Sequence, residues 1–163
     1  MAYQDESAEV HRILGTSLGE AQEFVHPQIG DDHVFLAMLQ EPYASTRTVL
    51  RHYENRLEEA RDIVRGLTKK WVFKKKRGKV KLPTATPEFN RVRVAALQIA
   101  RDLNGPTAEC EARHFLEAML LEVRRAELAE ENSNLLTLLN KLQIDYRALL
   151  ASVQGVNRPV VMS

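Results

Sequence analysis

The stretch His33-Val34-Phe35-Leu36-Ala37-Met38-Leu39 recurs 81 positions later as His114-Phe115-Leu116-Glu117-Ala118-Met119-Leu120, with His, Ala, Met and Leu in the same order. The match extends outward, at an offset of 79 before the stretch, as in Ser7 and Thr86, and at an offset of 89 after it. We expect the two register changes, of two and eight residues, to fall in connections and to spare the helices. Two copies of a unit too small to bury its own apolar face should stack into one body. The sequence therefore predicts one all-α domain over residues 1–163, with about eight helices related by a pseudo-twofold axis.

Apolar residues at helical spacing predict four helices in the first copy, repeat one, over residues 6–66. Ser7 is expected to cap the first helix and Asp31 the second, because short polar side chains accept hydrogen bonds from the first backbone N–H groups of a helix. The second helix, residues 33–40, is apolar on nearly all sides, which predicts burial at the centre of the unit. Two further helices follow, and Gly66 is expected to end the last one.

The second copy, repeat two, covers residues 85–155. Thr86 is expected to cap its first helix, and Gly105 to end it. The buried helix should restart near Glu111 and could run on through the charged stretch Glu122 to Glu131, and two leucine-rich helices follow. We expect residues 156–163 to form a loose tail.

Composition places the chain among soluble globular proteins, with 44% apolar and 28% charged residues. No apolar run reaches the roughly 18 residues of a membrane span, and the N-terminus has no signal peptide pattern. A single cysteine, Cys110, excludes an intramolecular disulfide and fits a reducing compartment. Because Cys110 aligns with Ile29 of repeat one, we expect a small buried apolar side chain there. We therefore expect a cytoplasmic monomer without membrane contact.

Charge is concentrated in a connector between the repeats, residues 67–84. Residues 69–81 carry +8, which leaves −7 for the rest of a chain whose net charge is +1. Cations interleaved with aromatic rings can contact phosphates and stack on bases, so one function left open is binding of nucleic acid or another polyanion. The residues of this alternative are Lys69, Lys70, Trp71, Phe73, Lys74, Lys75, Lys76, Arg77, Lys79 and Lys81.

Four structural interpretations of this connector also remain open. It could be a solvated linker, an ordered loop, a strip lying on the acidic body of its own chain, or a short hairpin that turns near Arg77-Gly78. A mobility-shift assay at physiological salt, with Lys74, Lys75, Lys76 and Arg77 changed to Ala, separates polyanion binding from the other interpretations.

Two tandem four-helix units, each with a capped first helix and a buried helix that opens with His and carries Ala-Met-Leu, resemble the Clp N-terminal domain. This double repeat precedes the ATPase rings of Clp-type AAA+ unfoldases. Gly30-Asp31-Asp32-His33 stands where the family commonly has Gly-Thr-Glu-His. The second copy departs from the pattern, because Cys110-Glu111-Ala112-Arg113-His114 lacks the glycine and has Arg113 in place of the acidic residue.

The resemblance implies a non-catalytic docking domain for substrate proteins, adaptors or a Clp AAA+ unfoldase or peptidase. Some family members recognise phosphorylated arginine through the acidic residue before each repeat's His. Asp32 matches that position with a shorter side chain, and Arg113 reverses its charge, so at most one such site is expected here. The resemblance places the ligand face in the groove between the repeats, beside the two buried-helix starts. The candidate contacts are Asp31, Asp32, His33, Glu111, Arg113 and His114.

Signals for an enzyme are poor. The chain lacks a Gly-x-x-x-x-Gly-Lys-Ser/Thr phosphate loop, and its histidines do not stand at metal-ligand spacing. We therefore expect no catalysis, no cofactor and no metal. His33 and His114 are instead expected to bond locally and to hold the buried helices in place.

Overall fold

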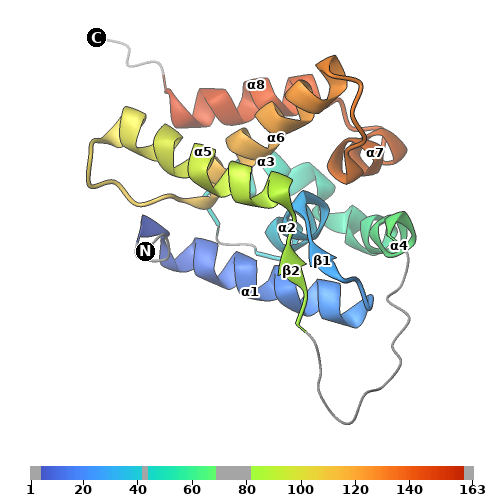
Figure 1. Cartoon of the computed structure of the whole chain (residues 1–163). Coiled ribbons are helices and arrows are strands. Elements are labelled where there is room, and N and C mark those ends of the chain that lie inside the picture. The colour runs from blue at the N-terminus through green and yellow to red at the C-terminus, as the bar shows by residue number, and fades with distance from the viewer. Residues whose placement is uncertain (1–4, 42–43, 69–81, 160–163) are drawn as a thin grey trace.

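The computed structural model describes residues 5–41, 44–68 and 82–159 of the 163-residue chain. These residues form two repeats of four helices each, as the sequence predicts (Figure 1). Repeat one contains α1 (Ala8–Glu23), β1 (Gln28–Ile29), α2 (Asp31–Leu39), α3 (Arg47–Leu50), a 3-10 segment (Arg51–Arg56) and α4 (Leu57–Leu67). Repeat two contains β2 (Thr84–Ala85), α5 (Pro87–Asn104), α6 (Ala112–Leu128), α7 (Asn134–Lys141) and α8 (Tyr146–Asn157).

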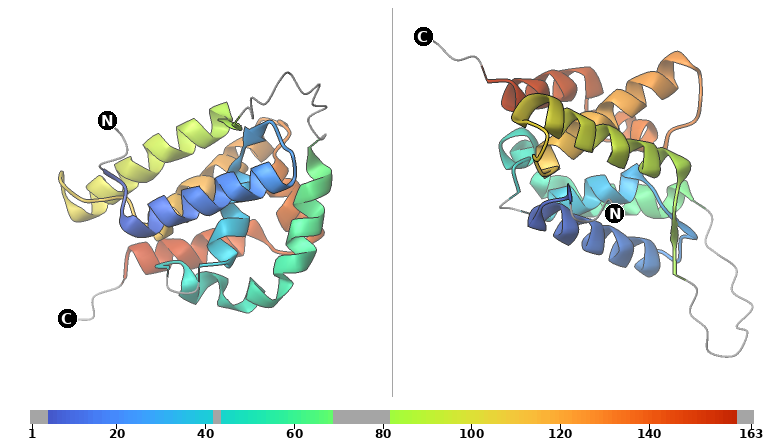
Figure 2. Two further views of the ribbon diagram at one scale, coloured as in Figure 1. Left: turned by 90° about the horizontal axis from the view of Figure 1, so that it is seen from below. Right: turned by 60° about the vertical axis from the view of Figure 1, so that its left-hand side comes forward.

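One core is shared by both repeats. Helix α2 is buried along its whole length, and it packs against α1 and α4 of its own repeat and against α6 and α7 of the other. Helix α6 is the equivalent centre of repeat two and packs against α5 and α8 (Figures 1 and 2). Phe35 and Leu36 on α2 and Phe115 and Leu116 on α6 are 1% exposed or less. The predicted burial of residues 33–40 is therefore confirmed for α2.

Short backbone pairings join the two repeats and are related by the pseudo-twofold symmetry. β1, just before α2, pairs in parallel with β2, just before α5, and the Thr86 N–H donates to the Ile29 carbonyl at 3.0 Å. The equivalent contact joins the segment before α6 to the segment before α1, where the Ser7 N–H donates to the Cys110 carbonyl at 2.9 Å. The segment before each central helix thus pairs with the segment before the first helix of the other repeat, and this pairing positions the central helix.

Both register changes lengthen helices, which corrects the expectation that insertions fall in connections. Helix α5 has 18 residues where α1 has 16, which accounts for the shift of two. Helix α6 has 17 residues where α2 has 9, which accounts for the shift of eight. In the added part of α6, Val123 and Ala126 are buried while Arg124 and Arg125 are exposed, so the extension continues the amphipathic pattern of the helix.

Several helix ends agree with the sequence and three do not. Ser7 and Thr86 cap α1 and α5 as predicted, and Gly105 ends α5 with a positive φ of 103°. Asp31 is not the cap of α2, because Gly30 takes that place and Asp31 is the first helical residue. Gly66 does not end α4, which runs to Leu67.

The third difference is at the C-terminal end. Helix α8 continues to Asn157, two residues into the range expected to be loose, because the side chain of Asn157 is buried and bonded to α6. The suggested hairpin near Arg77 lies outside the described residues, as do the basic residues 69–81.

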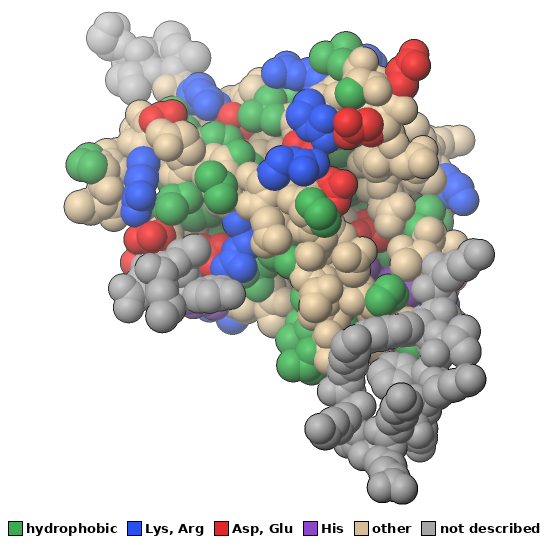
Figure 3. Space-filling model, in the orientation of Figure 1, with side chains coloured by type: hydrophobic (Ala, Val, Ile, Leu, Met, Phe, Trp, Pro, Cys, Tyr) green, Lys and Arg blue, Asp and Glu red, His purple; other side chains and the backbone are tan. Residues whose placement is uncertain are grey.

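The surface of the described residues mixes charges of both signs. Basic side chains lie beside acidic ones on the face that Figure 3 shows. Two of the ion pairs are Arg91–Glu122 and Arg125–Glu131, both at 2.8 Å. None of the helices in the described ranges is both long enough and apolar enough to cross a bilayer.

Candidate functional site

The first turn of each central helix is closed by a histidine at its third residue. The Gly30 N–H donates to His33 Nδ1 at 3.0 Å, and the Glu111 N–H donates to His114 Nδ1 at 3.0 Å. Both rings are at most 2% exposed. The local structural role expected for these two histidines is therefore confirmed.

In repeat one the histidine continues into a chain of hydrogen bonds. Because His33 Nδ1 accepts, its proton is on Nε2, which donates to His26 Nδ1 at 2.8 Å. The other nitrogen of His26 then donates to the Arg65 carbonyl at 3.3 Å, near the end of α4. Both rings are neutral in this arrangement, and they tie the start of α2 to α4.

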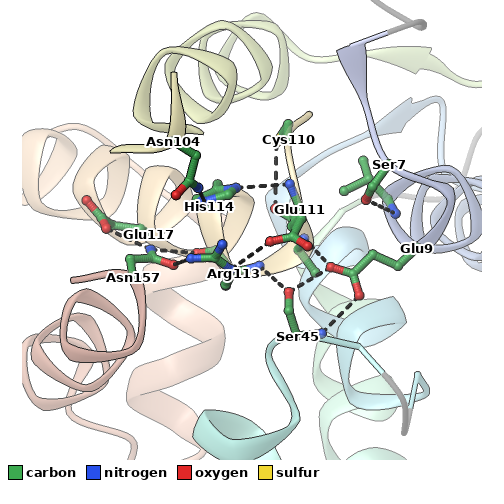
Figure 4. A network of polar contacts seen from close by, with 12 residues as sticks. Ser7, Glu9, Ser45, Asn104, Cys110, Glu111, Arg113, His114, Glu117 and Asn157 are labelled. Atoms are coloured by element: carbon green, nitrogen blue, oxygen red, sulfur yellow. Dashed lines mark hydrogen bonds and ion pairs between the residues drawn. The ribbon is translucent and has the colours of Figure 1, made fainter. Parts of the chain in front are cut away.

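The start of α6 is filled by side chains from repeat one (Figure 4). Glu9 Oε1 accepts from the Ala112 N–H at 2.8 Å, and Ser45 Oγ accepts from the Arg113 N–H at 2.9 Å. Ser45 also bonds Glu9 twice, through its N–H at 2.9 Å and its hydroxyl at 2.7 Å. A carboxylate at the positive end of a helix is electrostatically favourable, so Glu9 acts as an internal ligand of α6.

Arg113 is tied down beside this cluster and is not free to meet a ligand. Its Nε donates to Glu111 Oε2 at 2.8 Å, and its guanidinium also reaches Asn157 Oδ1 at 3.2 Å. Glu117, which replaces Leu36 of repeat one, is 1% exposed and accepts hydrogen bonds from Asn157 and Arg158. These contacts fasten the end of α8 to α6.

The start of α2 differs, because it opens onto a pocket of about 210 Å³ between the repeats. Here the side chains of Asp31 and Asp32 lie beside the first turns of α5 and α7 from repeat two. We call this hollow the acidic pocket, and its lining is Gly30, Asp31, Asp32, Thr86, Glu88, Asn132, Ser133, Asn134 and Leu135.

Two carboxylate oxygens in the acidic pocket have no partner among the described residues. Asp31 Oδ1 and Asp32 Oδ2 are both buried without a hydrogen bond, and their residues are 9% and 1% exposed. A buried polar atom without a partner costs on the order of 1–3 kcal/mol, so such atoms in a folded protein call for an explanation. The unpaired oxygens are the feature of this pocket that points to a ligand.

The electrostatics of the pocket keep Asp31 protonated near neutral pH. The pKa of Asp31 is raised from 3.8 to about 8, first by burial and then by the charges of Asp32, Glu122 and Glu88, while Arg91 opposes them. A carboxyl group removed from water and surrounded by like charge favours its neutral form.

Gly30 is required where it stands. A β-carbon at this position would lie 2.7 Å from Asp32 Oδ1, because the Asp32 carboxylate folds back over the Gly30 backbone. In repeat two the equivalent residues are Glu111 and Arg113. Once the acidic residue is replaced, the glycine is no longer needed.

The structure separates the six candidate contact residues into two groups. Asp31 and Asp32 line the acidic pocket, whereas His33 is used in capping. Glu111, Arg113 and His114 stand at the start of α6, where internal partners engage them. All the polyanion candidates, Lys69 to Lys81, lie outside the described residues, and polyanion binding stays a prediction.

Sequence reasoning missed several residues of this region. Glu9, Ser45, Glu117 and Asn157 form the α6 cluster, and only their contacts reveal it. One signal was available, because Glu9 aligns with Glu88 at the offset of 79 that relates the first helices.

Two reactive-site alternatives gain no support. Burial raises the pKa of the Cys110 thiol to about 12, with smaller increases from nearby acidic residues, so the nucleophilic thiolate is scarce. Within residues 5–41, 44–68 and 82–159, no group of three or more His, Cys, Asp or Glu side chains is placed to hold a metal ion.

Comparison with solved structures identifies the fold. The N-terminal domain of the ClpD chaperone from Arabidopsis thaliana matches with a TM-score of 0.71 and 14% identity over 95% of this chain and 96% of that chain. The Hsp104 N-terminal domain from Candida albicans matches with a TM-score of 0.66 and 10% identity over 96% and 93%. The ClpV N-domain in complex with a VipB peptide matches with a TM-score of 0.64 and 17% identity over 96% and 89%.

A search of curated proteins finds no match to the sequence. The model of the Clp repeat (R) N-terminal domain family matches residues 6–132, which is most of the chain and includes both central helices. Together with the two cross-paired repeats, this match shows that the chain belongs to the Clp repeat N-terminal domain family.

Proposed function

We propose that this chain is a non-catalytic docking domain that binds a segment of a partner protein at the acidic pocket. Clp N-terminal domains are protein-binding modules, and the ClpV N-domain was solved with a VipB peptide bound. The partner classes are substrate proteins, adaptors and components of a Clp chaperone–protease.

The observation that carries the proposal is the pair of buried, unpartnered oxygens, Asp31 Oδ1 and Asp32 Oδ2. The pocket that they line also presents Glu88, and its described lining residues include no lysine or arginine. Opposite charge stabilises a buried carboxylate, and a guanidinium can satisfy two acceptor oxygens at once. The pocket therefore favours a cationic side chain of the bound segment, with arginine the best geometric match.

The start of α6 is expected to contribute little. The backbone N–H groups of Ala112 and Arg113 already donate to Glu9 and Ser45. The guanidinium of Arg113 also repels a cation. Glu111, Arg113 and His114 are therefore proposed as structural supports rather than ligand contacts. One cationic side chain per domain follows from this assignment.

A matched pair of peptides tests the proposal. An acetylated, amidated peptide with one arginine is titrated into the ¹⁵N-labelled chain, and the same peptide with citrulline serves as the isosteric neutral control. We expect amide shifts at Asp31, Asp32, Thr86 and Ser133 for the arginine peptide alone, and about tenfold weaker binding by Asp32→Asn, the loss typical of one charge-assisted contact. Equal binding of both peptides, or shifts confined to the start of α6, contradicts the proposed site.

A further inference from the structure

Asp31 stands where the common family pattern has threonine. Its surroundings favour a protonated carboxyl group, which docking of a partner does not require. Its carboxyl group lies next to that of Asp32, and each has an oxygen that is buried and unpartnered within the described ranges. Two adjacent buried carboxylates cannot both be charged without a large desolvation and repulsion cost. In the absence of a cation, protonation of one of the two carboxyl groups lowers this cost.

Among the described residues, the groups that face Asp31 from each packed element leave little net positive charge beside it. Helix α2 supplies Asp32 and a neutral His33, and the first turn of α7 supplies only the polar and apolar side chains of Ser133, Asn134 and Leu135. Helix α5 brings Glu88 and Arg91, and α6 brings Glu122. The guanidinium of Arg91 donates to Glu122 at 2.8 Å, which in turn pairs with Arg125, so these charges largely cancel one another.

We propose that Asp31 holds a proton at neutral pH and releases it when a cationic side chain of a partner enters the acidic pocket. This inference rests on the proposed function and adds a form of regulation to it. The exchange is balanced: one proton leaves the Asp31 carboxyl group for water, one cation enters, and the net charge of the pocket is unchanged. Binding is therefore tighter at alkaline pH and weaker on acidification.

The assignment of the proton to Asp31 agrees with the electrostatics. Burial is the largest cause that raises the pKa of Asp31 to about 8, ahead of the charge of Asp32. An incoming guanidinium reverses the local field and lowers that pKa, which drives the proton off. Repeat two has Ala112 at the equivalent position and Glu9 in place of a ligand, so the exchange belongs to repeat one alone.

The experiment measures binding of the acetylated arginine peptide by the full chain at pH 7 and pH 9, in buffers of different ionisation enthalpy. The guanidinium stays charged throughout this range, so any pH dependence reports the protein. For a group that titrates near pH 8, the dissociation constant falls about tenfold between pH 7 and pH 9, and about 0.9 proton is released per peptide at pH 7. The Cys110 thiol, with its pKa near 12, does not contribute.

Two variants isolate the carboxyl group. Asp31→Asn should remove both the pH dependence and the proton release, whereas the same change at the exposed Asp62 should leave both intact. A ¹³C titration of the carboxyl carbons without peptide gives a second readout, with Asp31 expected to titrate near pH 8.

The outcomes separate this inference from the proposed function. If the arginine peptide binds with the same affinity at pH 7 and pH 9, the docking site stands and the proton exchange is wrong. Titration of Asp31 below pH 5 also overturns the exchange, whether or not the peptide binds. Absence of peptide binding at both pH values overturns the proposed site and the exchange that rests on it.

Discussion

The starts of α2 and α6 are equivalent positions in the two repeats, and they have opposite character. At α6, Glu9 and Ser45 of the other repeat satisfy the first two backbone N–H groups. At α2, the equivalent Glu88 makes no such contact, and the acidic pocket stays open. The first position of the helix accounts for the difference. Ala112 leaves room for a carboxylate, whereas Asp31 and Asp32 already place two carboxyl groups at the start of α2.

This comparison shows how a duplicated unit can keep its fold and divide its roles. The histidine cap and the backbone pairing before the central helix are the same in both repeats. A few substitutions beside the cap then turn one helix start into an internal joint and leave the other beside the acidic pocket. Four tests, from the largest expected effect to the smallest, sharpen or break this division.

The Asp31→Asn variant should have the largest effect on stability. The pKa of Asp31 is about 8 in the folded chain against 3.8 ordinarily, so its stabilising contribution is complete below 3.8 and is lost as pH rises toward 8. This one group lowers the free energy of unfolding by about 4 kcal/mol between pH 5 and pH 8. Urea denaturation of the variant at both pH values should lack that loss, and the Asp62→Asn chain should retain it. If Asp31→Asn leaves the pH dependence of the free energy of unfolding unchanged, Asp31 does not hold a buried proton.

His114 should give the opposite pH dependence in repeat two. Burial, followed by the charge of Arg113, lowers the pKa of His114 from 6.5 to about 4. The stabilisation is therefore complete above pH 6.5 and is lost as pH falls toward 4, a change of about 3 kcal/mol. His114→Gln removes the titrating group and should flatten the acid limb of the unfolding free energy, whereas the exposed His52→Gln should not. Identical acid limbs in all three chains would show that another group controls acid stability.

Glu9 and Glu88 form a matched pair for the helix starts. Glu9→Ala removes charge-assisted hydrogen bonds to Ala112 and Ser45, and it should lower the free energy of unfolding by about 2 kcal/mol. Glu88→Ala removes a half-exposed carboxylate without a hydrogen bond among the described residues, and its effect should stay within about 0.5 kcal/mol. Chemical denaturation at pH 7 checks both. Equal losses of unfolding free energy in the two variants would mean that Glu9 and Glu88 have the same role at their helix starts.

Arg113→Gln should lower the free energy of unfolding less than Glu9→Ala does. Its ion pair with Glu111 is partly exposed, and such pairs are worth less than about 1 kcal/mol. Removal of the positive charge should also fail to create binding of the arginine peptide, because Glu9 still occupies the start of α6. Calorimetric titration of the double variant Arg113→Gln, Asp32→Asn, in which binding at α2 is weakened, measures binding of the peptide at the start of α6. A new binding event there would show that the charge of Arg113, and not Glu9, closes the second site.

Much of the fold followed from local sequence. The periodicity of repeat one and repeat two, the caps Ser7 and Thr86, and the buried central helix were all predictable, because each depends on neighbours within a few residues. The end of α6 was not, because an inserted charged stretch such as Glu122 to Glu131 continues a helix as readily as it forms a loop. The ends at Gly66 and Asn157 were also missed, since Gly66 is tolerated inside a helix and Asn157 is held by a residue 40 positions away.

Asp31, Asp32 and the two histidines could be named from the sequence as residues at the helix starts, but their environment could not. Whether a carboxylate is buried, open or neutralised depends on residues 36 to 103 positions away, such as Ser45 against Glu9 and Glu9 against Ala112. The sequence by itself determined that there are two helical units with a shared interior, because apolar periodicity is a local property. Only the tertiary structure decided which helix start is filled and which is open, because desolvation and charge pairing act between segments that meet in space alone.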